Sequence, residues 1–179
     1  MKVLITGMPG SGKSTVVAEV VEELKRIGWT VGGVVCPDMR ENGVRAGFMM
    51  IDLMTGASGV LSSTIPSGGP RVGKYYVNTG ELDSIGATAI NHALSDADLV
   101  VIDEIGPMEL KSKAFGNVVQ QALKYDKDLL AVVHHTLTGR FSSVSIRCID
   151  VMPENRDEVV KTVVDLFLTS SMPSFRRSS

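Results

Sequence analysis

The first forty residues contain two short apolar runs separated by one amphipathic segment. The run from Lys2 to Thr6 has the length of a buried strand, and the run from Trp29 to Cys36 is rich in valine and glycine. Between them, from Lys13 to Ile27, apolar residues recur every three or four positions and charged residues fill the rest. This spacing predicts an amphipathic helix. A strand, a helix and a strand in this order predict two parallel strands joined by a right-handed crossover.

The second half of the chain repeats this alternation of helical and strand-like patterns. The segments are Glu81–Leu94 (helix), Leu99–Asp103 (strand), Ala114–Tyr125 (helix), Leu129–Val133 (strand) and Ile146–Val151 (strand). Gly86 weakens the first of these helices. Asn155, with Glu158 three residues later, is expected to cap a final helix. The alternation predicts an α/β fold in which helices flank a mostly parallel sheet.

The region between the two halves departs from this alternation. Residues Asp38 to Asn42 are polar and lead into an Asn-Gly turn pair. Val44 to Met54 is expected to be extended, and Ala57 to Ser62 to run back beside it. Lys74 to Asn78 adds a short strand after a loop that is rich in glycine and proline. We therefore expect an antiparallel β-hairpin insertion around residues 44–78, at the edge of the sheet.

Length and charge narrow the possible classes of protein. A chain of 179 residues fits one domain, which we place at residues 1–168, with a disordered tail at 169–179. The net charge of −2 and the dispersed basic residues argue against nucleic acid and anionic membranes as partners. The apolar runs are too short to cross a bilayer, and the first residues already form a strand. We expect a cytoplasmic protein, with a monomer as the favoured state and with Cys36 and Cys148 as buried free thiols.

The strongest functional signal lies between the first strand and the first helix. Gly7, four further residues and then Gly12-Lys13-Ser14 match the phosphate-binding P-loop pattern in its strand–loop–helix context. Backbone N–H groups of such a loop and the helix N-terminus bind phosphate. We expect Lys13 to reach the β- and γ-phosphates and Ser14 to ligate Mg²⁺. The expected nucleotide-binding residues here are Gly7, Met8, Pro9, Gly10, Ser11, Gly12, Lys13, Ser14 and Thr15.

A second candidate segment follows the apolar run Leu99–Ile102. Asp103 ends this run at the sheet edge where open α/β sheets bind ligands. A carboxylate there is a hard oxygen ligand, so we expect Asp103 to bind Mg²⁺ together with Ser14. Glu104 is next to it and is expected to prepare the attacking water. The predicted catalytic residues are therefore Glu104 and Lys13.

The residues after Glu104 extend the predicted nucleotide-binding set. Asp103, Glu104, Ile105 and Gly106 fit the Asp-x-x-Gly pattern of GTPases, whose glycine N–H contacts the γ-phosphate. A Ras-like GTPase is disfavoured because the chain lacks an Asn-Lys-x-Asp segment that reads guanine. Glu109 is open to two interpretations, a brace for this loop or a solvated acid.

Several other polar residues remain open as site candidates. His134 and His135 end the strand Leu129–Val133, and we expect capped, partly exposed side chains there, because two adjacent histidines without a carboxylate make a poor metal site. The transferring phosphoryl group usually needs a further positive charge. The candidates for it lie in or near loops, and the sequence does not choose between them: Arg40, Arg45, Arg71, Lys74 and Arg140.

These motifs together resemble a known family. Gly-Met-Pro-Gly-Ser-Gly-Lys-Ser-Thr at residues 7–15 and Val-Ile-Asp-Glu-Ile-Gly-Pro-Met-Glu-Leu at 101–110 are similar to the small P-loop nucleoside-triphosphatases first described from thermophiles, which include the cancer-related nucleoside-triphosphatase of animals. Residues 40–48, 73–77 and 154–157 also fit that family. The resemblance implies a RecA-like fold, use of Mg²⁺, and hydrolysis of ATP, GTP, CTP and UTP with little base preference. The chain departs from it at His134-His135, where members usually carry arginine or lysine.

The sequence thus favours a Mg²⁺-dependent nucleoside-triphosphate phosphohydrolase. The main alternative is a nucleoside or nucleotide kinase, because the loop Pro9–Lys13 is also found in kinases and the acceptor of the phosphoryl group is not encoded in it. A kinase is expected to carry an arginine-rich lid, and no dense arginine segment is present.

Overall fold

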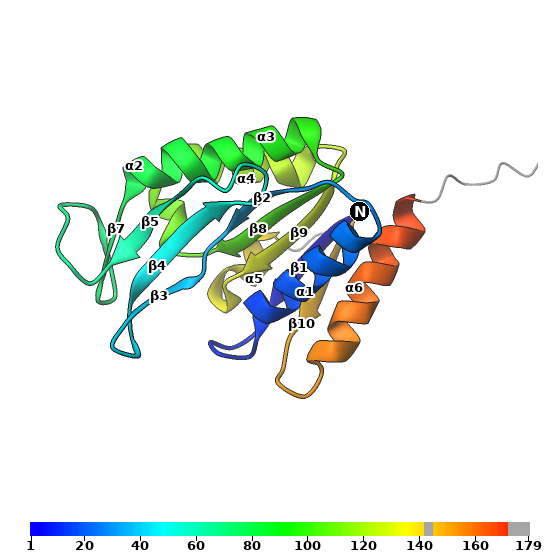
Figure 1. Cartoon of the computed structure of the whole chain (residues 1–179), viewed down its shortest axis with the longest axis horizontal. Helices are drawn as coiled ribbons and strands as arrows, with labels where there is room; N and C mark the ends of the chain where they lie inside the picture. Colours follow the sequence, from blue (N-terminus) through cyan, green and yellow to red (C-terminus); the bar gives the residue numbers. More distant parts are fainter. Residues whose placement is uncertain (142–144, 172–179) are drawn as a thin grey trace, which may run out of the picture.

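One mixed β-sheet runs through the molecule (Figure 1). The computed structural model describes residues 1–141 and 145–171. Its strands are β1 (Lys2–Thr6), β2 (Val31–Val35), β3 (Asp38–Glu41), β4 (Val44–Asp52), β5 (Ser58–Ser63), β6 (Arg71–Val72), β7 (Tyr75–Val77), β8 (Leu99–Ile105), β9 (Asp128–Val133) and β10 (Ile146–Asp150). Its helices are α1 (Lys13–Arg26), α2 (Thr79–Glu81), the π-helical η1 (Leu82–Ala87), α3 (Thr88–Asp96), the 3₁₀-helical η2 (Glu109–Lys111), α4 (Lys113–Lys124), the 3₁₀-helical η3 (His135–Leu137), α5 (Thr138–Phe141) and α6 (Arg156–Ser171).

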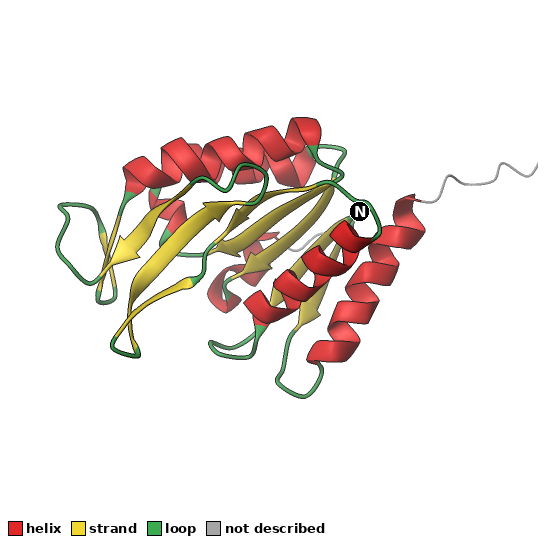
Figure 2. Ribbon diagram, in the orientation of Figure 1, coloured by secondary structure: helices red, strands yellow, loops and turns green. Residues whose placement is uncertain are grey.

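The sheet order is β10-β1-β9-β8-β2-β4-β5-β7-β6, with β3 paired to β4. The five strands from β10 to β2 are parallel. Their continuous apolar runs are explained by helices on both faces (Figure 2). On one face α1 and α6 pack against a cluster that includes Val3, Val101 and Phe167. On the other face η1, α3 and α4 cover a cluster that includes Ile102 and Phe115. The predicted sheet with flanking helices is confirmed.

The predicted antiparallel insertion is also confirmed, but it begins earlier than expected. β4 joins the sheet through a short antiparallel pairing of Val34 with Asp52 and Val35 with Ile51, and β5, β7 and β6 continue outward. The polar residues 38–41, which precede the predicted insertion, form strand β3, and β3 pairs with β4. Asn42 and Gly43 both have positive φ, 50° and 79°, which is the backbone of a two-residue hairpin turn.

The helix expected over residues 81–94 is interrupted. Residues 79–96 form α2, the π-helical segment η1 and α3 in direct succession. Gly86 lies within η1, where a Cβ atom would fall 2.9 Å from the sulfur of Met50 and 3.0 Å from the ring of Phe115. Glycine at this position therefore permits close packing of η1 on the sheet and on α4.

The C-terminal part of the chain extends the predicted boundaries. Helix α6 continues to Ser171, beyond the domain end that we placed at residue 168. Of the predicted tail 169–179, residues 172–179 lie outside the described part of the chain. The side chain of Asn155 accepts the Met152 N–H and donates to the carbonyl of Asp150. It thus ties the loop before α6 together.

Both cysteines are free thiols, as predicted. Cys36 is half-buried, but Cys148 is exposed, which corrects the expectation of a buried side chain. The reason is that β10 is the outermost strand on its side of the sheet, so that residues along it are incompletely covered. Across residues 1–141 and 145–171, every helix is too short or too polar to cross a bilayer.

Candidate active site

The loop between β1 and α1 is curled around the ammonium group of its own lysine. The Nζ atom of Lys13 donates to the carbonyl oxygens of Gly7 at 3.0 Å and of Met8 at 3.1 Å. Gly12 is the N-cap of α1, with a left-handed φ of 100°, and no side chain caps this helix end within the described residues. The first N–H groups of α1 are therefore free to bind an anion at the positive end of the helix dipole.

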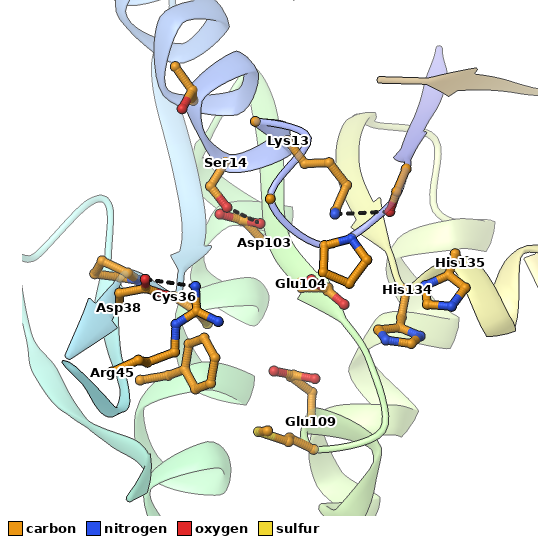
Figure 3. A pocket seen from close by; sticks show the side chains of 18 of the residues that line it. Lys13, Ser14, Cys36, Asp38, Arg45, Asp103, Glu104, Glu109, His134 and His135 are labelled. Carbon is orange, nitrogen blue, oxygen red and sulfur yellow. Dashed lines mark hydrogen bonds and ion pairs between the residues drawn. The ribbon is translucent and has the colours of Figure 1, made fainter. Parts of the chain in front are cut away.

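The second predicted segment meets this loop through one contact. The Ser14 hydroxyl donates to the Oδ1 atom of Asp103 at 3.3 Å (Figure 3). The Asp103 side chain is only 4% exposed, and its burial raises the pKa of this carboxyl to about 7, although the hydrogen bond from Ser14 acts in the opposite direction. A carboxylate taken out of water in this way is stabilised by a cation.

A hydroxyl and a carboxylate oxygen are hard donors that fit Mg²⁺. No group of three or more His, Cys, Asp or Glu side chains that could hold a metal ion is found in the described ranges. The two donors Ser14 and Asp103 therefore suit an ion that takes its remaining ligands from water and phosphate oxygens. Mg²⁺ is usually bound in this way.

Glu104 lies on the wall of the same cavity. It is half-buried at the end of β8, where the pairing with β9 shifts register between Ile102 and Ile105. Figure 3 shows its carboxylate beside the P-loop, close to the cavity that Lys13 also lines. The structure thus brings Lys13, Ser14, Asp103 and Glu104 together at one edge of the parallel sheet.

Glu109 is the third carboxyl group of this region. It is 6% exposed, and burial raises its pKa to about 8, although hydrogen bonds from its own N–H and that of Gly106 act in the opposite direction. The nearby charges of Glu104 and Asp103 raise the pKa further. No ion pair joins Glu109 to a basic side chain among residues 1–141 and 145–171. Of the two interpretations left open by the sequence, the solvated acid is wrong.

A cavity of about 770 Å³ connects these groups. The predicted residues that line it are Gly7, Pro9, Gly10, Gly12, Lys13, Ser14, Thr15, Asp103 and Glu104. The other predicted binding residues lie elsewhere. Met8 is 66% exposed, Ser11 is buried inside the loop, and the side chain of Ile105 is fully buried in the core. Gly106 is buried, and its N–H is bound to Glu109.

Of the basic candidates, Arg45 lines the cavity. It pairs with Asp38 at 2.9 Å, and its guanidinium lies 5.3 Å from the centre of the Phe48 ring. The other candidates are engaged at different places. Arg40 donates to Asp38 and to the carbonyl of Gly43, Arg71 donates to the carbonyl of Gly73, Lys74 lies over the ring of Tyr75, and Arg140 is exposed in α5.

A family model described as NTPase matches residues 2–164. The chain belongs to the NTPase family. Among its relatives, "Nucleoside-triphosphatase THEP1" of Methanothermobacter thermautotrophicus is 44% identical over 167 residues, which cover 93% of this chain and 95% of the relative. The protein of the same name from Methanocaldococcus jannaschii is 39% identical over 168 residues, which cover 94% of this chain and 98% of the relative.

Solved structures of NTPase-family proteins have the same fold. The crystal structure of THEP1 from the hyperthermophile Aquifex aeolicus is 29% identical, with a TM-score of 0.81 over 93% of this chain and 99% of that one. The solution structure of a human cancer-related nucleoside triphosphatase is 28% identical, with a TM-score of 0.77 over 96% of this chain and 99% of that one. The family that the sequence motifs indicated is thereby confirmed.

His134 and His135 of this NTPase-family chain line the cavity. Their rings contact each other, and the ring of His134 also contacts Thr136. The Nδ1 atom of His134 lies 2.9 Å from the hydroxyl of Thr136 and accepts the Thr136 N–H at the start of η3. The His134 and His135 rings lie 4.3 Å apart, with 33° between their planes. His134 is half-buried and His135 is exposed, so the expected capped and partly exposed arrangement is confirmed.

Sequence reasoning missed residues on two sides of the site. Cys36, Phe48, Val72 and Met108 line the cavity. Phe48 and Met108 fall within segments that fit the family, but neither was proposed as a site residue. Arg156 lies against the P-loop, because a Cβ atom on Gly12 would fall 2.5 Å from its Cδ atom. Arg156 is the first residue of α6, after β10, which is the parallel neighbour of β1. The signals for it in the sequence are this position and the fit of residues 154–157 to the family.

Proposed function

We propose that this chain hydrolyses nucleoside triphosphates in the 770 Å³ cavity, releasing a nucleoside diphosphate and phosphate with the help of Mg²⁺. The observation that carries the proposal is the contact between Ser14 and Asp103, which joins the P-loop to the end of β8. It puts a phosphate-binding loop, two hard oxygen donors and the carboxylate of Glu104 around one cavity. Membership of the NTPase family supports the same reaction.

In this mechanism the P-loop binds the triphosphate. Lys13 exchanges its contacts with the loop carbonyls for the β- and γ-phosphate oxygens, and the free N–H groups at the start of α1 bind the phosphates from the other side. Ser14 and Asp103 would hold Mg²⁺. When bound, the ion neutralises negative charge on the β- and γ-phosphates.

Glu104 acts on the attacking water. Its carboxylate accepts a proton from the water as the water oxygen forms a bond to the γ-phosphorus. The bond from that phosphorus to the bridging β–γ oxygen breaks, and the nucleoside diphosphate leaves with the electron pair. The neighbouring Asp103 is buried, so that solvent screens its electrostatic interactions only weakly.

We also propose that ATP, GTP, CTP and UTP are all substrates. The groups assigned to catalysis contact phosphate and metal, which the four nucleotides share. The printed names of the relatives specify a nucleoside triphosphate and no particular base.

Phosphate release from each of the four triphosphates, measured with Mg²⁺ and without any added acceptor, tests the proposal. Lys13→Ala and Glu104→Gln are each expected to lower the rate about a hundredfold or more, through lost phosphate binding and lost general-base catalysis. Glu22→Gln removes an exposed carboxylate from α1 and serves as the matched control. An unchanged rate in Glu104→Gln would remove Glu104 from the mechanism, and no phosphate release by the unmodified protein would refute the proposed function.

A further inference from the structure

The cavity extends beyond the groups that the hydrolysis mechanism uses. Its far wall, which we call the outer compartment, is formed by Cys36 after β2, by residues of β3 and β4, and by the segment between β8 and η2 with the first residue of η2. Its residues are Cys36, Asp38, Arg45, Phe48, Met108 and Glu109. In the view of Figure 3, Arg45, Asp38 and Glu109 lie below the contact between Ser14 and Asp103, on the side away from α1. The outer compartment therefore adjoins the place where the γ-phosphate is expected.

One side of the outer compartment carries an ordered positive group. Arg45 uses one guanidinium nitrogen, Nη2, for the 2.9 Å contact with Asp38, so that its remaining N–H donors are available to a ligand. Asp38 also pairs with Arg40 at 3.0 Å, which leaves two guanidinium groups for one carboxylate. A surplus guanidinium with a fixed fork of donors is suited to phosphate.

The same side carries an aromatic surface. The Phe48 ring lies under the Arg45 guanidinium, and it packs edge-on against Tyr75 with 5.4 Å between ring centres. This contact and the antiparallel pairing of β4 hold the ring in place. Guanidinium planes and aromatic rings are both surfaces on which planar heterocycles stack.

Glu109 supplies an independent sign of a ligand. It is 94% buried, lines the cavity and has no basic partner within the described residues. Two N–H groups use part of its capacity to accept hydrogen bonds, and a carboxyl group accepts more than two. A ligand with amino, ring N–H or hydroxyl donors completes the hydrogen bonding of a group that water reaches poorly.

We propose that the outer compartment binds a nucleoside monophosphate, and that the chain transfers the γ-phosphoryl group to it when it is present. Nucleoside monophosphates combine an anionic group for Arg45, a planar ring for the aromatic surface and hydrogen-bond donors for Glu109. This inference rests on the proposed function, because the phosphoryl donor is the triphosphate held by the P-loop.

The reaction balances without a further reactant. A phosphate oxygen of the monophosphate attacks the γ-phosphorus and forms the new oxygen–phosphorus bond. The bond between that phosphorus and the bridging β–γ oxygen breaks, and its electron pair stays with the leaving diphosphate. One triphosphate and one monophosphate give two diphosphates, and the acceptor, as a dianion, has no proton to lose. Water attacks in the same place when the outer compartment holds no acceptor.

Transfer is measured with γ-labelled ATP, Mg²⁺ and each of AMP, GMP, CMP and UMP, followed by chromatographic separation of the products. We expect label to appear in a nucleoside diphosphate, with a rate that saturates as the monophosphate concentration rises, while release of free phosphate falls. Arg45→Ala is expected to raise the monophosphate concentration for half-maximal transfer about tenfold or more, through loss of a charged hydrogen bond. Arg40→Ala is the matched control, because Arg40 also pairs with Asp38 but is not among the cavity-lining residues.

A second measurement keeps binding separate from chemistry. Equilibrium binding of the monophosphate is measured while a non-hydrolysable triphosphate analogue saturates the P-loop, and persistence of binding supports the inference. Loss of binding under these conditions means that the monophosphate only competes for the P-loop, and it overturns the inference. Phosphate release without any labelled diphosphate also overturns it but leaves the proposed function standing, whereas absence of both release and transfer refutes the proposed function.

Discussion

The buried carboxyl of Glu109 makes the free energy of unfolding depend on pH, and the substitution Glu109→Gln tests the direction of this dependence. Its pKa is raised from 4.5 to about 8, chiefly by burial. Between these two values the folded chain holds a proton that the unfolded chain releases. The free energy of unfolding therefore falls as the pH rises through this window, and the contribution levels off above the folded pKa. Below the pKa of the unfolded chain the carboxyl is protonated in both states, and Glu109 causes no loss of stability.

The magnitude follows from the pKa difference. At about 1.4 kcal/mol per pH unit, the window from 4.5 to about 8 corresponds to about 5 kcal/mol. Glu109→Gln keeps an oxygen that accepts the N–H groups of residues 106 and 109, but it cannot ionise. The variant is therefore expected to match the unmodified protein at about pH 5 and to be more stable by about 3–5 kcal/mol at about pH 9.

Urea unfolding of both proteins at these two pH values is the appropriate assay. The difference between variant and unmodified protein isolates residue 109 from the other titrating groups, among them Asp103, which is also buried. Glu22→Gln measures the effect of removing one solvated charge. A difference between Glu109→Gln and the unmodified protein that stays constant from pH 5 to pH 9 would refute the reasoning from burial.

Three further predictions concern the sheet, the metal ligand and the P-loop. Gly33→Ala is expected to lower the free energy of unfolding by about 2–4 kcal/mol, because φ is 109° and the new Cβ would lie 2.0 Å from the carbonyl oxygen of Val101. The control Gly43→Ala, with φ of 79° and open space around it, measures the backbone cost alone. Equal losses of stability for the two variants in urea titrations would contradict the steric argument. Asp103→Asn is expected to raise the Mg²⁺ concentration for half-maximal phosphate release about tenfold or more, since an amide is a weaker ligand than a carboxylate; an unchanged Mg²⁺ titration would exclude Asp103 as a ligand. Gly12→Ala is expected to weaken binding of a fluorescent triphosphate analogue about tenfold, because φ is 100° and the Cβ would lie 2.5 Å from Arg156; an unchanged affinity would show that the loop adapts.

The sequence predicted those parts of the molecule that local patterns determine. The P-loop was recognisable because its function requires particular residues at consecutive positions, and α1 begins at Lys13 as expected. The run that ends at Asp103 placed the second segment at the correct sheet edge, because the C-terminal ends of parallel strands share one side. The contact between Ser14 and Asp103 follows from these two placements.

Other parts of the site depend on packing that no local pattern reports. Strand β3 is rich in charged residues and carries no strand pattern in the sequence, so its conformation is determined by pairing with β4. Arg45 could not be separated from the other basic candidates, because its position on the cavity is set by the register of β4. The sequence left Glu109 open between a brace for the loop and a solvated acid, and only the tertiary structure shows that it is buried.

The two ends of the cavity are built on two different kinds of strand pairing. The phosphate end is built on parallel strands locked between helical layers, whereas Arg45 and Phe48 stand on an antiparallel ribbon that adjoins those strands through the short pairing of β2 with β4. Substitutions in the ribbon can thus alter which ligand the outer compartment binds without changing the residues that bind phosphate. In such an architecture, the choice of a second ligand is free to diverge among proteins that keep identical phosphate chemistry.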